Sequence, residues 1–460
     1  MSAIERAGAP PEWGIDPVPP EERVLGSFDL AILWGDLGIG LLVLVTGALL
    51  VPGLGIGPAL AAVVVGSVIG VALLALAGVA GAAHGVPTMA LFRPILGVRG
   101  SWLPSVLNAA QLVGWTAVEF WAMSFVADLV VRRVFGFSAR PLWLLLAALA
   151  CTGLALWGPV GVTRTWMKRF SAWIVIAIAL ALTLLLLTSG AISAALGAPA
   201  TGSWPSFGGA LDLVIAMPIS WLPLVADYNR FARGRRPAFT GTFVGYLVAN
   251  IWLYALGALL VLGEGVAPTP AGIAAGILAL AGGSLAGLLF LVALLVGETD
   301  EAFADMYSGA ISVRNIVPSA PQDAVIVALA VLATILAGWL SMARYESFLF
   351  LLGSVFVPLF GILTARYFVP RRDQRRPQAV EARFAEAMRT AAVLAWIVGF
   401  AAYHWVAPSG PQWWLDLVAA AFGDPLGARV GWLPASLVSF GASFLLAAPA
   451  ARRSRTPSAL

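Results

Sequence analysis

The chain is short of charge, cysteine and histidine, and each shortage excludes a class of protein. Only 11% of its 460 residues are charged, whereas a soluble protein would carry about a quarter. The single Cys151 excludes a disulfide within the chain and a cysteine-based metal centre. His84 and His404 lie far apart in the sequence, so a zinc or haem site has no support, and we expect no cofactor.

The chain is instead rich in long apolar runs. Hydrophobic residues make up 60% of the chain, and they recur in runs of about 20 residues, long enough to cross ~30 Å of hydrocarbon. We predict an all-α polytopic membrane protein with about twelve transmembrane helices, at 28–51, 58–82, 103–130, 141–159, 170–190, 207–228, 239–262, 278–310, 322–341, 346–369, 389–406 and 431–450. Between the last two, "QWWLDLVAAAF" is amphipathic and is expected at the membrane interface.

The basic residues are distributed unevenly between the loops. With a cytoplasmic N-terminus, 22 of the 27 basic residues fall on the cytoplasmic side, as the positive-inside rule requires. The outer side keeps Arg132, Arg133, Arg140, Arg344 and Arg429. The net charge of +4 is therefore a topology signal and not evidence for a nucleic-acid partner. We expect both termini in the cytoplasm and, since the first 25 residues contain no apolar core, no cleaved signal peptide.

Two spans contain residues that interrupt a helix. The first contains "WGDLGIG" (34–40) and the sixth contains "AMPISWLP" (216–223). These spans open two candidate halves of five spans each, and because five is odd, the second half enters the membrane from the opposite side. Inverted repeats with paired broken helices are typical of secondary transporters, whose substrate site lies where the breaks meet. The alternative for each break is close helix packing, which Gly and Pro also serve.

The third span contains "QLVGWTAVEFW" (111–121), in which Trp115 and Glu119 are four residues apart on one helical face. An indole beside a carboxyl group suits a flat heteroaromatic ring: the ring stacks, and the acid bonds its edge. A protonated Glu119 could donate to a ring nitrogen and accept from an exocyclic amine. The alternative for Trp115 is an ordinary packing or lipid-facing aromatic, whereas acids within the membrane are rare without a function.

The stretch "GETDEAFADMYSG" (297–309) carries four carboxyl groups at the end of an uncharged run. At 100° per residue, Glu298, Glu301 and Asp305 share one helical face and Asp300 points away from it. Their repulsion requires protonation or a cation, so the coupling ion would be Na⁺ or H⁺. The alternative is that the span ends near residue 297 and the acids lie in a solvated loop.

Further polar residues accompany these spans. Within "DYNRFARGRR" (227–236), Asp227 lies beside a basic cluster and is expected to act as a cytoplasmic gate or a helix-end pair. Additional candidates for polar residues lining the site are Tyr307, Ser220, Asn108 and Gln111.

Four segments in order resemble the nucleobase:cation symporter-1 family, the purine–cytosine permeases. They are "GVPTMALFRPILGVRGSWLPS" (85–105), "GW" with Glu119 in the third span, "DYNRF" at the end of the sixth, and "VPLFGILTARYFV" (357–369) in the tenth. Within the family, the acidic stretch and the opening "ERVLGSFDLAILWGDLGIGLLVL" look most like the transporters of hydroxymethylpyrimidine, a thiamine precursor.

The resemblance implies a LeuT-type 5+5 inverted repeat followed by two extra helices. The expected division is a cytoplasmic segment 1–27, a transporter core 28–369 with repeats at about 28–190 and 207–369, a cytoplasmic basic linker 370–388, two further spans within 389–450, and a cytoplasmic tail 451–460.

The resemblance also implies roles for individual residues. Trp115 matches the stacking Trp of the third span, and Glu119 stands where the family has a hydrogen-bonding Gln. Asp305 falls among substrate-side Asn residues, and Trp221 is the replacement for an aromatic that would fall nearer Met217 and Pro218. Asp36, in the first break, and Ser220 complete the candidate substrate site.

Asp300 and Glu301 match a hydroxyl pair that holds Na⁺ in sodium-coupled members, where backbone of the first break, here near Gly38, completes the ion site. Acids in place of hydroxyls weaken the case for Na⁺ at this site and allow proton coupling. No other metal site is expected.

The sequence thus predicts a cation-coupled symporter of the cell membrane, not an enzyme, that imports an aminopyrimidine. Hydroxymethylpyrimidine is the first expectation and cytosine the second, with another purine, pyrimidine or hydantoin-type heterocycle as the alternative. A passive channel and a membrane-embedded, metal-dependent transferase are more remote. The expected partners are the heterocycle and the lipid bilayer, with no nucleic acid, and the protein is expected to function as a monomer.

Overall fold

The computed structural model describes residues 13–158, 161–202, 204–340, 345–369 and 389–453. Within these ranges the chain is helical and without a strand, apart from an isolated parallel bridge between Leu25 and Ala232. The longer helices are α3 (Ile56–His84), α6 (Trp102–Phe135), α7 (Arg140–Trp157), α9 (Ala172–Thr188), α13 (Arg235–Glu264), α15 (Leu285–Ile316), α16 (Gln322–Ala337), α17 (Tyr345–Phe368), α18 (Thr390–Val406) and α21 (Ala435–Arg453).

Shorter helical elements break or connect these. They are η2 (Pro20–Glu22), α1 (Ser27–Asp36), α2 (Leu41–Ala48), α4 (Thr88–Leu91), α5 (Arg93–Leu96), the π-helical η3 (Val162–Ser171), α10 (Ala191–Gly197), α11 (Phe207–Ser220), α12 (Val225–Asn229), α14 (Pro270–Leu280), α19 (Gln412–Phe422) and α20 (Leu426–Arg429).

Each of the twelve predicted spans coincides with one helix or with a broken pair of helices. Six helices of the described chain are long and apolar enough to cross a membrane, or seven if the bent pair α1–α2 counts as one span. Of the remaining predicted spans, α11, α16, α18 and α21 are apolar but shorter, and α15 is long but carries four carboxyl groups. The predicted interfacial segment is α19. The linker 370–388, residues 1–12 and residues 454–460 lie outside the described residues.

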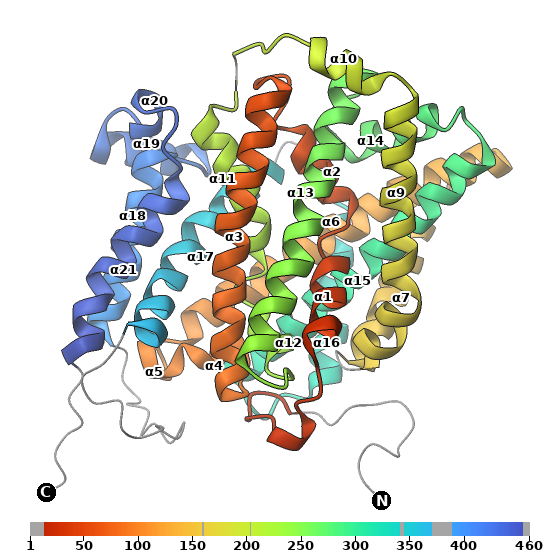
Figure 1. Cartoon of the computed structure of the whole chain (residues 1–460). Coiled ribbons are helices and arrows are strands. Elements are labelled where there is room, and N and C mark those ends of the chain that lie inside the picture. The colour runs from red at the N-terminus through yellow and green to blue at the C-terminus, as the bar shows by residue number, and fades with distance from the viewer. Residues whose placement is uncertain (1–12, 159–160, 203, 341–344, 370–388, 454–460) are drawn as a thin grey trace, which may run out of the picture.

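The helices form one bundle in which α13 stands between α3 on one side and α1 and α2 on the other, and α11 packs against α3 (Figure 1). Helices α17, α18 and α21 pack together at one side of the bundle, and α7 and α9 lie at the other. The first described residues and the end of α21 lie at one end of the bundle, whereas α10, α19 and α20 lie at the opposite end.

The first predicted break is confirmed. Helix α1 ends at Asp36 and α2 begins at Leu41, with a 62° bend between their axes. Small residues allow the close packing that holds the broken pair against α13: a Cβ built on Gly38 would lie 2.8 Å from the Cβ of Ala249. The loose backbone at the break is thus buried in protein, as a membrane environment requires.

The second predicted break is also confirmed. Helix α11 ends at Ser220 and α12 begins at Val225. Pro218 inside α11 has no amide hydrogen to donate, so a helical hydrogen bond is lost there. Side chains of α6 supply donors to the interrupted turn: Gln111 Nε2 donates to the carbonyl of Ser220 and Asn108 Nδ2 to that of Pro223, both at 3.4 Å.

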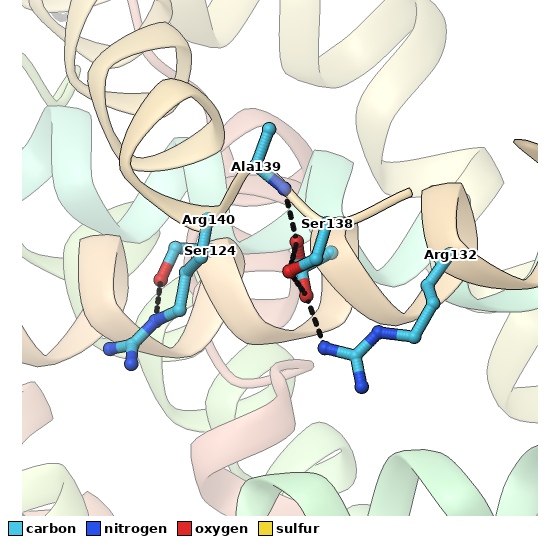
Figure 2. Close-up of polar contacts among 6 residues, drawn as sticks. Ser124, Arg132, Ser138, Ala139 and Arg140 are labelled. Carbon is cyan, nitrogen blue, oxygen red and sulfur yellow. Dashed lines mark hydrogen bonds and ion pairs between the residues drawn. The ribbon is translucent and has the colours of Figure 1, made fainter. Parts of the chain in front are cut away.

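A polar corner joins α6 to α7 at the end predicted to face outside (Figure 2). Asp128 accepts hydrogen bonds from Arg132 Nη2 at 2.7 Å, from Ser138 Oγ at 2.8 Å and from the Ala139 amide at 2.9 Å. Arg140 Nε donates to Ser124 Oγ at 3.1 Å, which ties the start of α7 back to α6. The corner fixes the angle between two helices that both pack against α15.

Candidate substrate and ion site

Helix α15 continues without interruption through the acidic stretch, and all four of its acids are buried. The exposed fractions are 0% for Glu298 and Asp300, 3% for Glu301 and 2% for Asp305. The alternative of a solvated loop beginning near residue 297 is therefore wrong.

The four acids face two sides of α15, as the helical phase predicts. Glu298 Oε1 accepts a hydrogen bond from the Leu41 amide at the start of α2, at 2.5 Å, and the carboxyl groups of Glu298 and Glu301 both lie against Gly40. Asp300 instead faces η3, where it accepts from Trp166 Nε1 at 2.7 Å and from Ser171 Oγ. One side of the helix thus faces the first break and the other faces η3.

Asp36 and Asp300 form a carboxyl pair across the first break. Their side chains are in hydrogen-bonding contact, and Ser171 Oγ, which donates to Asp300, also lies 3.4 Å from Asp36 Oδ1. Two carboxyl groups in such contact require a shared proton or a cation. The nearby Lys168 does not supply that charge, because its Nζ pairs with Asp29 at 2.6 Å.

Glu119 of α6 faces the acids of α15 from the opposite helix. Its side chain is 1% exposed and lies in the electrostatic field of Asp305, Glu301 and Glu298. Buried polar atoms in proteins are nearly always bonded. In the described chain, carboxyl oxygens of four further residues at this site have no hydrogen-bond partner: Glu119 Oε2, Glu298 Oε2, Glu301 Oε1 and Asp305 Oδ2. The site therefore presents acceptors that the protein itself does not satisfy.

The metal-binding potential of the acids is limited. Among the described residues, no three His, Cys, Asp or Glu side chains are grouped so that they could hold a metal ion. A cation at Asp300 and Glu301 would therefore need backbone ligands from the first break, as the family resemblance implies, or would have to be a proton.

The two predicted stacking tryptophans lie on different elements, Trp115 in α6 and Trp221 in the second break. Trp115 is 5% exposed and meets Phe348 edge-on, with ring centroids 5.3 Å apart. Trp221, in the second break, meets Trp34 of α1 edge-on at 6.1 Å. Trp34 in turn donates from Nε1 to Asn229 Oδ1 at 2.9 Å. Trp34 therefore connects the two broken helices, a role that its position in the sequence did not reveal.

Ser220 lies at the end of α11 with its hydroxyl turned toward its own helix. Ser220 Oγ donates to the Met217 carbonyl at 2.6 Å. Its own carbonyl accepts from Gln111 Nε2. Gln111 precedes Trp115 by four residues on α6, so the two share one helical face.

Asp227 lies in α12, at the end of the sixth predicted span, and joins it to the start of α4. Asp227 Oδ1 accepts from the Thr88 amide at 2.9 Å, and Thr88 Oγ1 accepts from the Ala226 amide at 2.9 Å. Its neighbour Arg230 donates to the Gly14 carbonyl at 2.5 Å and to the Tyr307 hydroxyl at 3.0 Å. This small network connects the N-terminal segment, α12 and α15.

An N-terminal strap, residues 13–26, covers the same end of the bundle. Leu25 and the segment after α12 exchange backbone bonds, from the Leu25 amide to the Phe231 carbonyl and from the Arg233 amide to the Leu25 carbonyl, both at 2.9 Å. The Val18 amide donates to the Gly85 carbonyl at 2.8 Å. The strap thus ties the ends of α3 and α12 together.

Sequence reasoning missed several members of this site. Trp166 and Ser171 lie on η3, more than 120 residues from Asp300 in sequence, and no local pattern predicts their contact. The sequence placed Glu298 on one helical face with Glu301, but it predicted no separate role for Glu298 at the first break.

A family described as permease for cytosine/purines, uracil, thiamine, allantoin matches residues 17–424. The chain belongs to this permease family. It is therefore a transporter and not an enzyme, and a multi-pass membrane protein.

Curated relatives of the permease carry related names. The chain is 30% identical over 259 residues to YxlA of Bacillus subtilis (strain 168), named as a purine-cytosine permease, a match that covers 54% of the chain and about half, 53%, of that relative. It is 23% identical to the hydantoin permease of Microbacterium maritypicum, over 76% of the chain and 74% of the relative. It is 25% identical to the cytosine permease of Escherichia coli (strain K12), over 78% and 81%.

Solved structures confirm the predicted fold. Mhp1, a nucleobase-cation-symport-1 family transporter in a closed conformation with bromovinylhydantoin bound, superposes with a TM-score of 0.79 at 20% identity, covering 96% of the permease and 95% of Mhp1. A Na⁺-coupled sialic acid symporter gives a TM-score of 0.61 at 13% identity, over 94% and 91%. This likeness bears out the LeuT-type inverted repeat with two additional helices.

Proposed function

We propose that the permease imports a small aminopyrimidine together with a cation, with hydroxymethylpyrimidine as the first candidate and cytosine as the second. The observation that carries the proposal is the buried Glu119, which shares a partly unsatisfied acid cluster with α15 beside the first break. The permease family and its fold support the class of transport.

The proposed substrate site pairs ring stacking with acid recognition. Trp115 and Trp221 would contact the faces of the heterocycle, because large indole rings bind flat aromatics well. Glu119 and Asp305 would form hydrogen bonds with the edge of the ring, and Asp36 and Ser220 would contribute polar groups at the breaks. A 4-aminopyrimidine carries an amine donor next to a ring nitrogen, and a protonated carboxyl group can accept from the first and donate to the second.

The proposed coupling ion, Na⁺ or H⁺, offsets the charge of the acids. Asp300 and Glu301, with backbone near Gly38, form the proposed ion site, and the contact between Asp36 and Asp300 supports it because that contact requires a positive charge. Binding of the ion would reduce the repulsion among the acids of the site, and would thus favour substrate binding.

The proposal also assigns an inner gate, an orientation in the membrane and a functional unit. Asp227, bonded to the Thr88 amide, would act as the inner gate, and both termini would face the cytoplasm of a cell whose membrane the permease spans. The core would comprise residues 28–369 and the two extra spans 389–450, and a single chain would be the functional unit.

One alternative substrate class has a specific observation behind it. A hydantoin permease is among the relatives, and the superposed Mhp1 structure contains a hydantoin derivative. A hydantoin or another purine or pyrimidine is therefore the alternative substrate class.

The test is binding of a panel of ligands to the purified permease. The panel contains hydroxymethylpyrimidine, cytosine, uracil and hydantoin, each measured with Na⁺ and with choline at equal ionic strength. We expect an aminopyrimidine to bind at least about tenfold tighter than uracil, because uracil lacks the exocyclic amine and would leave an acid unpaired. Equal or tighter binding of uracil or hydantoin would overturn the aminopyrimidine assignment. Recovery of the ligand chemically altered would contradict transport as the function.

A further inference from the structure

A cavity of about 290 Å³ lies at the end of the bundle opposite the N-terminal strap, between α18, α19 and the start of α20. It is far from the acids of α15 in the chain and belongs to the two helices that follow the inverted repeat. Most of its lining is apolar, including Trp405, Leu415 and Phe422. Its polar lining comes from His404, Gln412 and Asp416.

The position of the hydrogen on His404 follows from its contacts. His404 Nδ1 accepts from Trp414 Nε1 at 3.2 Å and from the Ser409 amide at 3.4 Å. A neutral imidazole carries its hydrogen on the other nitrogen when one nitrogen accepts, so Nε2 is a donor. The residue is 0% exposed, and its Nε2 has no hydrogen-bond partner in the described chain. His404 is one of the residues that line the cavity, and its Nε2 is a donor that no group of the described chain satisfies.

The rim of the cavity carries a carboxylate, which a cationic group of a ligand could neutralise. Asp416 is exposed and is held in place by Gln412 Nε2, which donates to Asp416 Oδ1 at 2.8 Å. A ligand that satisfies both residues needs an acceptor oxygen near the buried His404 and a cationic group nearer to water at Asp416. It also needs an apolar portion for the remaining wall.

The surface around the cavity is suited to a membrane interface. Helix α19 exposes Trp413 at 68% and Leu417 at 54%, and Phe422 at its end is 42% exposed. Exposed Trp and Leu on a short amphipathic helix are typical of the boundary between headgroups and acyl chains. The buried donor of His404 and the exposed carboxylate of Asp416 follow the order of groups in a phospholipid headgroup, whose phosphate lies deeper than its terminal amine.

We propose that this cavity binds the headgroup of a phospholipid that carries a primary ammonium group, such as phosphatidylethanolamine. A phosphate oxygen accepts from His404 Nε2, the ammonium group pairs with Asp416, and the glycerol region contacts Leu415 and Phe422. The site is separate from the proposed transport site, so the lipid proposal does not depend on which substrate is transported.

The test is native mass spectrometry of the detergent-purified permease titrated with phosphatidylethanolamine or phosphatidylglycerol of identical acyl chains. We expect about fivefold preference for phosphatidylethanolamine, because phosphatidylglycerol offers no cation to the exposed Asp416. Asp416→Asn should abolish that preference, and His404→Phe should weaken both lipids about fivefold through loss of the bond to phosphate. Asp424→Asn, an exposed acid that pairs with Arg429 on α20, is the matched control and should behave like the unmodified permease.

Two results would overturn the site. One is equal retention of both lipids by the unmodified permease, and the other is an unchanged preference in Asp416→Asn. Because His404→Phe also removes the acceptor for Trp414, Asp416→Asn provides the test that leaves the helix contacts intact. Soluble glycerophosphoethanolamine is added as a competitor, and we expect no displacement at equal concentration because it lacks acyl chains. Displacement as efficient as that by the lipid would contradict a membrane ligand.

Discussion

Glu119 is a single carboxyl group placed among three others in a site from which water is largely excluded. At this position a carboxyl group and an amide differ in one respect that matters to a ligand: only the carboxyl group can carry a charge or give up a proton. Under the proposed function, Glu119 recognises the heterocycle while it lies in the electrostatic field of Glu301, a residue of the proposed ion site.

The substitution Glu119→Gln tests that role. We expect it to weaken binding of the aminopyrimidine about 10- to 100-fold, the usual range for losing a hydrogen bond to a charged or ionisable partner. Ligand binding to the purified variant is the measurement. Glu264→Gln, at the exposed end of α13, is the control and should bind normally. Normal binding by Glu119→Gln would remove Glu119 from the substrate site.

Trp115→Ala tests the stacking contact. We expect at least a tenfold loss of substrate affinity, because a base stacked on an aromatic side chain contributes about 1–3 kcal/mol. Initial uptake rates, normalised to the amount of permease in the membrane, report the effect in cells. Trp339→Ala is the control, since Trp339 is 81% exposed. If both variants transport equally well, Trp115 is a packing residue against Phe348 and no more.

At the scale of residues, periodicity predicted which side chains share a face of one helix. It could not predict contacts between side chains of different helices. The separation of Asp300 from Glu298 and Glu301 followed from 100° per residue and is confirmed. The bonds of Trp166 and Ser171 to Asp300 could not be predicted, because they depend on how η3 packs against α15.

The broken pair α1–α2 is the element on which the site depends. The amide of Leu41, at the start of α2, is unpaired within its own helix and donates to Glu298. The absence of a side chain at Gly40 allows the carboxyl groups of Glu298 and Glu301 to approach the break. The bend therefore creates both the donor and the space that the acids use.

Gly40→Ala should disturb this arrangement without changing the backbone, which is extended at this residue, with φ at −139°. A Cβ there would lie 2.8 Å from Glu298 Oε1, so the acids must move. We expect about a tenfold loss of uptake, in line with the cost of overpacking a buried site. Gly57→Ala is the matched control, because a Cβ on Gly57 meets open space. Equal uptake by the two variants would contradict a functional role for the close approach.

Among the elements, the breaks were predictable because Gly and Pro mark them directly in the sequence. The short helices α4, α5 and α14 were not predicted as separate elements, since their apolar residues continue the pattern of the neighbouring spans or are too few to show a period. The N-terminal strap was predicted only as a cytoplasmic segment. Its bonds to Gly85 and Phe231 involve backbone atoms, which leave no signature in the side chains.

The whole molecule combines an inverted repeat with an asymmetric charge distribution. The described N-terminal strap and the end of α21 lie at the same end of the bundle, as an even number of spans requires. The positive-inside rule then predicts which side of the membrane that end faces.

Membrane-impermeant labelling tests this orientation. The single cysteine, Cys151, is buried, so cysteines introduced at exposed positions can be read separately. We expect Ser138→Cys, in the corner between α6 and α7, to react in intact cells, and a cysteine added after Leu460 to react only after permeabilisation. Labelling in the reverse pattern would contradict the proposed topology.

The central claim is that buried acids at the first break bind a coupling cation while a planar heterocycle binds beside them. Its most direct test is uptake of labelled hydroxymethylpyrimidine or cytosine by proteoliposomes that contain only the purified permease. With an inward gradient of Na⁺ or of H⁺, the account predicts accumulation above the external concentration, and collapse of the driving gradient should release it. Uptake that only equilibrates, whichever gradient is imposed, would contradict the account and indicate a passive channel.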